Sequence, residues 1–246
     1  MAAIRRITRA CGAPSEPWTF DQFAAVTFDR GLWFEPGQGW AYSNPGYMLL
    51  KRIVERVSGR SLRDLVADRI CRPLALRRTY VAQSIADLAD LAPAMSSALS
   101  PEGVSRDVRA HYHPGWVSHG VIASTASDVA RFIDALVGGA LLSAASLAGM
   151  TDVVALPSGP ADPPSPTTGP ARVGTPSYGL GIMGDPNSPW GLALGHNGGG
   201  PGYAASVFRV SEPPGATACA LGAFEEFPAA DLVYDVFDSL AVHRSP

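Results

Sequence analysis

Two short segments of the sequence contain side chains that could carry chemistry, Tyr42-Ser43-Asn44 and His196-Asn197-Gly198-Gly199. A phenol and an imidazole can both transfer protons, and a histidine does so near neutral pH. The amide of Asn44 could hold a substrate, and backbone N–H groups in a glycine-rich turn could stabilise an oxyanion. The alternative is structural: Asn44 only caps a helix, Tyr42 only packs, and His196 is a solvated histidine in a glycine-rich hairpin.

The first segment lies between a predicted turn and a predicted helix. Residues 36–39, Pro-Gly-Gln-Gly, are typical of a turn. Asn44 is the predicted N-cap of the helix, and Pro45 occupies the first helical position, where a proline loses no hydrogen bond. Apolar residues then recur at helical spacing until Gly59 ends the run, and they are Tyr47, Leu50, Ile53, Val54 and Val57. We therefore expect Tyr42 and Asn44 to be held at the mouth of a helix.

The second segment lies in a part of the chain with strand character. Short apolar runs separated by turn residues predict an antiparallel meander. The predicted strands are Tyr178–Met183, Gly191–Leu194, Ala204–Val210 and Thr217–Ala223. A final helix is predicted over Ala229–Val242, and residues 156–177, rich in Pro, Gly, Ser and Thr, are predicted to form a mobile surface loop.

Further helices are predicted from capping residues upstream of that meander. A capping box at Thr19 and Gln22 starts a short helix through Val26, and Ser61 precedes a helix over Leu62–Ile70. Thr125, with Asp128 three residues later, starts a helix that ends at Gly138-Gly139. Ser143 caps another short helix.

The composition excludes several classes of function. The 246 residues carry a net charge of −3 without a basic run, which disfavours nucleic acid or an anionic membrane as partner. No apolar run has membrane-spanning length, and no secretion signal is visible in Met1–Ala10, so the compartment does not follow from the sequence. Cys11, Cys71 and Cys219 have no metal-binding or disulfide spacing and are interpreted as buried thiols.

We expect no metal at His111, His113 and His119. We also expect no cofactor. Residues Gly179–Gly184 match Gly-x-Gly-x-x-Gly, but no helix can start at the Asp-Pro-Asn-Ser-Pro that follows, so a dinucleotide site is not expected there.

Taken together, the motifs resemble the serine beta-lactamase-related family, which includes class C beta-lactamases, D-alanyl-D-alanine carboxypeptidases and related esterases. The resemblance rests on Tyr42-Ser43-Asn44 before a helix, on residues 120–132, on Tyr178-Gly179-Leu180-Gly181 and on His196-Asn197-Gly198. It is densest over residues 34–79, 120–142 and 178–203. It implies a single α+β domain over residues 1–246, with an antiparallel sheet flanked by helices and a helical region beside it.

The resemblance also implies roles for individual residues. Members of the family attack an amide or ester carbonyl with a serine and pass through an acyl-enzyme. Tyr42 would be the general base or acid, and Asn44 would hydrogen-bond the substrate amide. His196 would replace the lysine of a Lys-Thr-Gly motif. Asn197, Gly198 and Gly199 would bind the substrate, a small molecule or a peptide, with the Gly199 N–H as half of an oxyanion hole. Tyr42 and His196 are therefore expected to face each other across one cleft.

The nucleophile motif of the family, Ser-x-x-Lys, does not occur in these 246 residues. Lys51 is the one lysine, and Met48 stands three residues before it. We therefore expect a chain without the N-terminal strands and the nucleophile helix of the family, inactive as it stands, with one sheet edge left open. The alternative is a non-catalytic relative that keeps the cleft for a peptide or acyl ligand. The sequence does not fix the oligomeric state.

Overall fold

The computed structural model describes residues 16–28, 31–100, 102–117, 119–156 and 174–242. The chain divides into two compact units, residues 1–124 and 125–246, and each is described by itself. A mixture of helices and antiparallel sheet confirms the predicted fold class. The prediction that the whole chain forms one domain stays a prediction. Most of the predicted loop, residues 157–173, lies outside the described residues.

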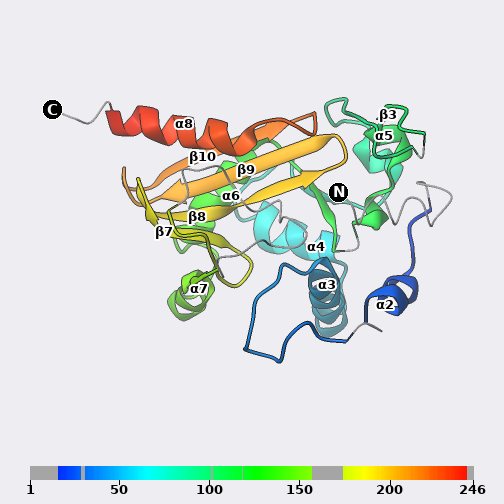
Figure 1. The fold of residues 1–246 in the computed structure, drawn as a ribbon, viewed down its shortest axis with the longest axis horizontal. Helices are drawn as coiled ribbons and strands as arrows, with labels where there is room; N and C mark the ends of the chain where they lie inside the picture. Colours follow the sequence, from blue (N-terminus) through cyan, green and yellow to red (C-terminus); the bar gives the residue numbers. More distant parts are fainter. Residues whose placement is uncertain (1–15, 29–30, 101, 118, 157–173, 243–246) are drawn as a thin grey trace. The chain divides into compact units, whose positions relative to one another are not determined.

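The first unit is mainly helical (Figure 1). Its strands form two short antiparallel pairs, β1 with β4 and β2 with β3. Its helices are α2 (Phe20–Phe28), α3 (Asn44–Ser58), α4 (Leu62–Val66), η1 (Ala67–Cys71), η2 (Ile85–Leu88), α5 (Val108–His111) and η3 (Pro114–Trp116). Its strands are β1 (Tyr80–Ala82), β2 (Met95–Ser96), β3 (Arg106–Asp107) and β4 (Val121–Ala123).

The capping signals of this unit act largely as predicted. Thr19 and Gln22 form a reciprocal pair of hydrogen bonds at the start of α2, and Gly59 ends α3 in the left-handed conformation with φ of 65°. Ser61 caps α4 by accepting a hydrogen bond from the Asp64 N–H. The helix predicted over Leu62–Ile70 continues into η1, whose π-type turn reaches Cys71.

Helix α3 directs most of its apolar residues outward. Met48 is 3% exposed and faces the core, and Lys51 and Glu55 are half-buried on the same side. The predicted apolar spacing is present, but four members of that run are between 45% and 82% exposed: Leu50, Ile53, Val54 and Val57. The helix therefore exposes most of its apolar run, while Lys51 and Glu55 are half-buried on the side of Met48.

The second unit is a six-stranded antiparallel sheet with helices on both faces. The strand order is β10-β9-β8-β7-β6-β5. The strands are β5 (Val154–Ala155), β6 (Ser177–Tyr178), β7 (Met183–Ser188), β8 (Gly191–Gly200), β9 (Tyr203–Val210) and β10 (Ala216–Gly222). The helices are α6 (Ala126–Val137), α7 (Ala144–Thr151) and α8 (Ala229–Val242), with α8 at the predicted residues.

Successive residues of β9 show which helix covers which face of the sheet. Val207 packs against Ile133 and Leu136 of α6, whereas the Phe208 ring lies 5.9 Å from the Tyr234 ring of α8. Because neighbouring side chains of a strand point to opposite faces, α6 and α8 cover opposite sides of the sheet. Figure 1 shows α8 lying along strands β8 to β10. Among the described strands, β10 is at one edge of the sheet.

Two predicted strand boundaries are wrong. The strand predicted over Tyr178–Met183 is broken by a turn over residues 179–182, in which the Gly179 N–H donates to the Ile182 carbonyl and Gly181 has φ of 78°. The strand predicted over Gly191–Leu194 continues through the glycines to Gly200 as β8. Pairing with β9 holds this glycine-rich segment extended, and the turn comes afterwards, at Pro201-Gly202.

Candidate functional site

The first half of the predicted site lies where α3 begins. Ser43, in extended backbone conformation, is the N-cap, and its Oγ accepts a hydrogen bond of 3.0 Å from the Gly46 N–H. The prediction that Asn44 is the N-cap is therefore wrong by one residue. The Ser43 hydroxyl accepts the hydrogen bond of the helix-terminal N–H of Gly46, three residues later. Asn44 is instead the first helical residue and is exposed. Its side-chain amide is not needed to cap α3.

Tyr42 is half-buried next to Tyr47, with ring centroids 5.7 Å apart. Burial raises the pKa of Tyr42, and the neighbouring Tyr47 phenol raises that pKa further. Tyr42 therefore keeps its proton at neutral pH. It can donate a hydrogen bond, but it would act as a base only beside a positive charge that lowers its pKa.

The second half of the predicted site is on β8, in the second unit. His196 lies between two oxygen atoms: its Nε2 is 2.9 Å from the Tyr178 hydroxyl, and its Nδ1 is 2.5 Å from the Asn197 carbonyl oxygen. The Tyr178 and His196 rings meet edge to face, with centroids 5.8 Å apart. The turn over residues 179–182 returns the chain from β6 to β7, next to β8, and so brings Tyr178 to His196.

These contacts define the tautomer of His196. A backbone carbonyl can only accept a hydrogen bond, so Nδ1 carries the proton. Burial lowers the pKa of His196 below its ordinary value of 6.5, and the hydrogen bond to the Asn197 carbonyl offsets only part of that effect. The neutral imidazole therefore presents an Nε2 lone pair, which accepts the hydrogen bond from the Tyr178 hydroxyl. At neutral pH, His196 does not supply the positive charge that a lysine would.

Tyr178 is the residue of this site to which the sequence analysis assigned no role. The sequence signal was present, because Tyr178-Gly179-Leu180-Gly181 is one of the motifs that carry the resemblance. The missing information was the contact itself, which joins residues 18 positions apart.

The three residues after His196 continue β8 and pair with β9. Asn197 is opposite Ser206, Gly198 is opposite Ala205, and Gly199 is opposite Ala204. The neighbour on the other side, β7, pairs with β8 only as far as Gly195. From His196 to Gly200, therefore, β9 is the only described strand that pairs with β8.

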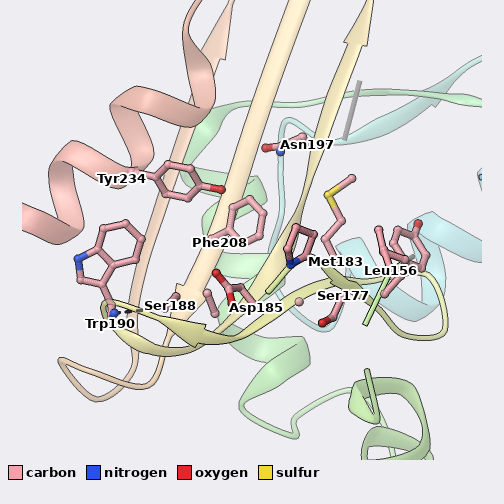
Figure 2. A pocket seen from close by; sticks show the side chains of 13 residues that line it. Leu156, Ser177, Met183, Asp185, Ser188, Trp190, Asn197, Phe208 and Tyr234 are labelled. Atoms are coloured by element: carbon pink, nitrogen blue, oxygen red, sulfur yellow. Dashed lines mark hydrogen bonds between the residues drawn. The ribbon is translucent and has the colours of Figure 1, made fainter. Parts of the chain in front are cut away.

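The Asn197 side chain enters a cavity of about 40 Å³ that belongs to the second unit (Figure 2). Phe208 and Tyr234 also line this cavity. Asn197 Oδ1 is buried without a hydrogen-bond partner among the described residues, as is the hydroxyl of Ser206 opposite it. Because His196 and Asn197 are consecutive in a strand, their side chains point to opposite faces of the sheet. A ligand that meets the His196 ring would meet Asn197 through its backbone.

The structure thus brings together His196, Tyr178 and the backbone of Asn197, Gly198 and Gly199. It separately brings together Tyr42 and Asn44 at the start of α3. These two groups belong to different units, and their predicted meeting across one cleft stays a prediction, as does the role of the Gly199 N–H.

The remaining histidines and cysteines form no metal centre within the described residues. His113 Nδ1 accepts a hydrogen bond from the Gly115 N–H at the start of η3, and His111 Nδ1 lies 2.9 Å from the Asp107 carbonyl. Cys71 is buried and Cys219 is half-buried, and neither forms a disulfide with a described residue, while Cys11 lies outside the described part. None of the described helices combines the length and the apolar character needed to cross a lipid bilayer.

Comparison with known proteins gives a family match over most of the chain. The family model described as Beta-lactamase matches residues 8–217. Penicillin-binding protein 4* of Bacillus subtilis (strain 168) is 28% identical over 209 residues, which are 75% of this chain and 40% of that protein. This chain therefore spans less than half the length of that relative.

Solved structures share the fold. A D-stereospecific amidohydrolase from Streptomyces sp. has a TM-score of 0.72 and 26% identity, over 95% of this chain and 63% of that chain. A D-amino acid amidase from Ochrobactrum anthropi SV3, complexed with L-phenylalanine amide, has a TM-score of 0.70 and 23% identity, over 94% of this chain and 65% of that chain. Identity below 25% shows the fold alone, so the second comparison supports only the architecture.

Proposed function

Because the chain belongs to the beta-lactamase family, we propose that it binds the acyl donor of a serine hydrolase, an amide or an ester, and that these 246 residues alone do not turn it over. The absence of turnover follows from the missing Ser-x-x-Lys, since removing the nucleophile of such a catalytic unit removes nearly all of its chemistry. The donor could be a β-lactam, a D-amino acid peptide or a carboxyl ester.

The observation that carries the proposal is the edge of β8 from His196 to Gly200. In an antiparallel strand, alternate residues direct their N–H and C=O groups to opposite sides. One set points to β9, and the other set meets no strand among the described residues. An extended substrate can add to such an edge through main-chain hydrogen bonds, with an amide or acyl group placed beside His196.

The protonation states support binding rather than attack. Tyr42 holds its proton, so its hydroxyl can donate to a carbonyl or a leaving group. His196 is neutral and is oriented by Tyr178, and its Nε2 can accept a proton or a hydrogen bond. Neither Ser15 nor Ser43 replaces the nucleophile: Ser15 has no lysine partner in a Ser-x-x-Lys pattern, and the Ser43 hydroxyl caps α3.

Incubation with nitrocefin, p-nitrophenyl butyrate, D-phenylalanine amide and a fluorescent β-lactam tests the proposal. We expect no sustained hydrolysis and no covalent adduct in the intact mass spectrum. An acetylated D-alanyl-D-alanine peptide should bind reversibly and shift the backbone amide resonances of residues 196–200. We expect His196→Ala to weaken this binding by about tenfold, the loss of one good polar contact, whereas His111→Ala serves as the matched control. Turnover with an acylated serine in this chain would contradict the proposal.

A non-catalytic relative is the second candidate, and the pKa of Tyr42 favours it, because burial and the neighbouring Tyr47 phenol raise that pKa and so make the phenol a poorer base. The two candidates differ in what a longer reading frame would contain. A Ser-x-x-Lys found in frame upstream, together with hydrolysis by the longer product, would support the hydrolase. Binding without hydrolysis by that longer product would support the non-catalytic relative.

A further inference from the structure

The first unit contains a hollow that none of the predicted site residues lines. Its volume is about 230 Å³. It is lined by the inner side of α3, the first residue of α4, strand β1 and the loop around η3, including Lys51, Glu55, Leu62, Val81, Gln83 and Val117. A water molecule occupies about 30 Å³ in the liquid, so the hollow has room for a ligand of several non-hydrogen atoms.

Two opposite charges line this hollow without pairing with each other. Lys51 and Glu55 are one turn apart on α3, and both are half-buried. No ion pair within 4.0 Å joins them, and no described side chain pairs with the Lys51 ammonium group. The Lys-to-Glu order is the less favourable one for a helical ion pair, which is consistent with their separation.

The carboxylate of Glu55 is held in place from the other side. Its Oε1 accepts a hydrogen bond of 2.9 Å from the Leu62 N–H. Leu62 is the first residue of α4, so its N–H has no partner within that helix. This bond fixes the side chain and leaves Oε2 for another donor. Burial is the main cause that lowers the pKa of His119, and the positive charge of Lys51 lowers that pKa further. The Lys51 charge is therefore felt by a half-buried side chain of the same unit.

The chemistry of the hollow therefore favours a ligand that carries both charges. An anion alone would be attracted by Lys51 and repelled by Glu55, and a cation alone would meet the reverse. A partly buried charge without a partner costs free energy, so a ligand that satisfies both groups at once gains the most. The neighbouring side chains of Leu62, Val81 and Val117 are apolar and leave room for a small aliphatic substituent.

We propose that this hollow binds a small zwitterion, an α-amino acid whose carboxylate contacts Lys51 and whose ammonium group contacts Glu55. The site belongs to the first unit alone and does not depend on the acyl-donor binding proposed above. Its ligand is recognised by the two opposite charges on one side of α3, with Leu62, Val81 and Val117 beside them.

The single lysine makes the test specific. Protein produced with ¹⁵N-labelled lysine gives one side-chain ammonium signal, that of Lys51 Nζ. We expect this signal to shift saturably with glycine and with D-alanine, and to shift at least tenfold less readily with acetate or methylammonium. Glu55→Gln should weaken glycine binding at least tenfold, because a charged contact becomes neutral, whereas Arg56→Gln on the exposed side of α3 should leave it unchanged.

Every outcome of this titration is informative. A lysine signal that does not move with glycine would overturn the proposal, and so would equal binding of acetate and glycine, which would identify a site for simple anions. Equal loss in the Glu55→Gln and Arg56→Gln variants would also overturn it. Thermal unfolding of each variant shows whether the helix is intact, and unchanged acyl-peptide binding shows that the two proposed sites are independent.

Discussion

The contact between Tyr178 and His196 gives a prediction that separates a hydrogen bond from mere burial. Tyr178→Phe removes the hydroxyl that donates to His196 Nε2. A typical hydrogen bond within a protein contributes about 0.5–1.5 kcal/mol to the free energy of unfolding. Tyr178 is 6% exposed and His196 is half-buried, so solvent replaces the lost donor only in part, and we expect a loss of about 1 kcal/mol.

Tyr234 provides the matched control in the same unit. It is 5% exposed, and none of the described groups hydrogen-bonds its hydroxyl. Tyr234→Phe should therefore change the unfolding free energy by less than about 0.5 kcal/mol. Urea unfolding of the two variants measures the difference, and a long-range ¹H–¹⁵N spectrum of the wild type should show His196 protonated at Nδ1. Equal costs for the two substitutions, or an Nε2–H tautomer, would refute this account of the site.

The same structure yields three further predictions. Gly195→Ala should destabilise the fold by about 3 kcal/mol or more, because an added Cβ would lie 2.0 Å from a backbone oxygen of β9. Gly199→Ala is the control and should not destabilise the fold, because an added Cβ there would have no neighbouring atom within 4 Å. Urea unfolding measures the two free energies. Phe237→Ala should cost about 3–5 kcal/mol in the same assay, since Phe237 is 0% exposed, and a cost below about 1 kcal/mol would place it outside the core. Stability should fall as pH drops through 6.5 toward the lowered folded-state pKa values of His196 and His119, because the unfolded chain takes up those protons first. The slope should shrink in His196→Gln, and an unchanged slope would contradict the predicted burial effect.

The elements that the sequence predicts best are those with local signals. Gly59, Ser61, Thr125 and Ser143 all act at the helix ends where their residue types place them. The last helix needs only its apolar period, and its bounds agree with the prediction. These signals act within one or two turns of helix, so no knowledge of the tertiary structure is needed to interpret them.

The features that the sequence misses depend on partners far along the chain. Glycines 198–200 have a low strand propensity, but pairing with β9 keeps them extended. The tautomer of His196 depends on Tyr178, which approaches only after an unpredicted turn. The periodic spacing of apolar residues in α3 predicts that the helix has an apolar face. It does not predict which face of the helix the rest of the unit covers.

That outward face has a practical consequence for work with this chain. An exposed hydrophobic patch about two helical turns long is formed by Leu50, Ile53, Val54 and Val57. Sulfate and phosphate are excluded from protein surfaces and strengthen the association of exposed hydrophobic patches. We therefore expect this chain to precipitate at a low concentration of ammonium sulfate. Dyes whose fluorescence rises on binding apolar surface should bind the folded chain.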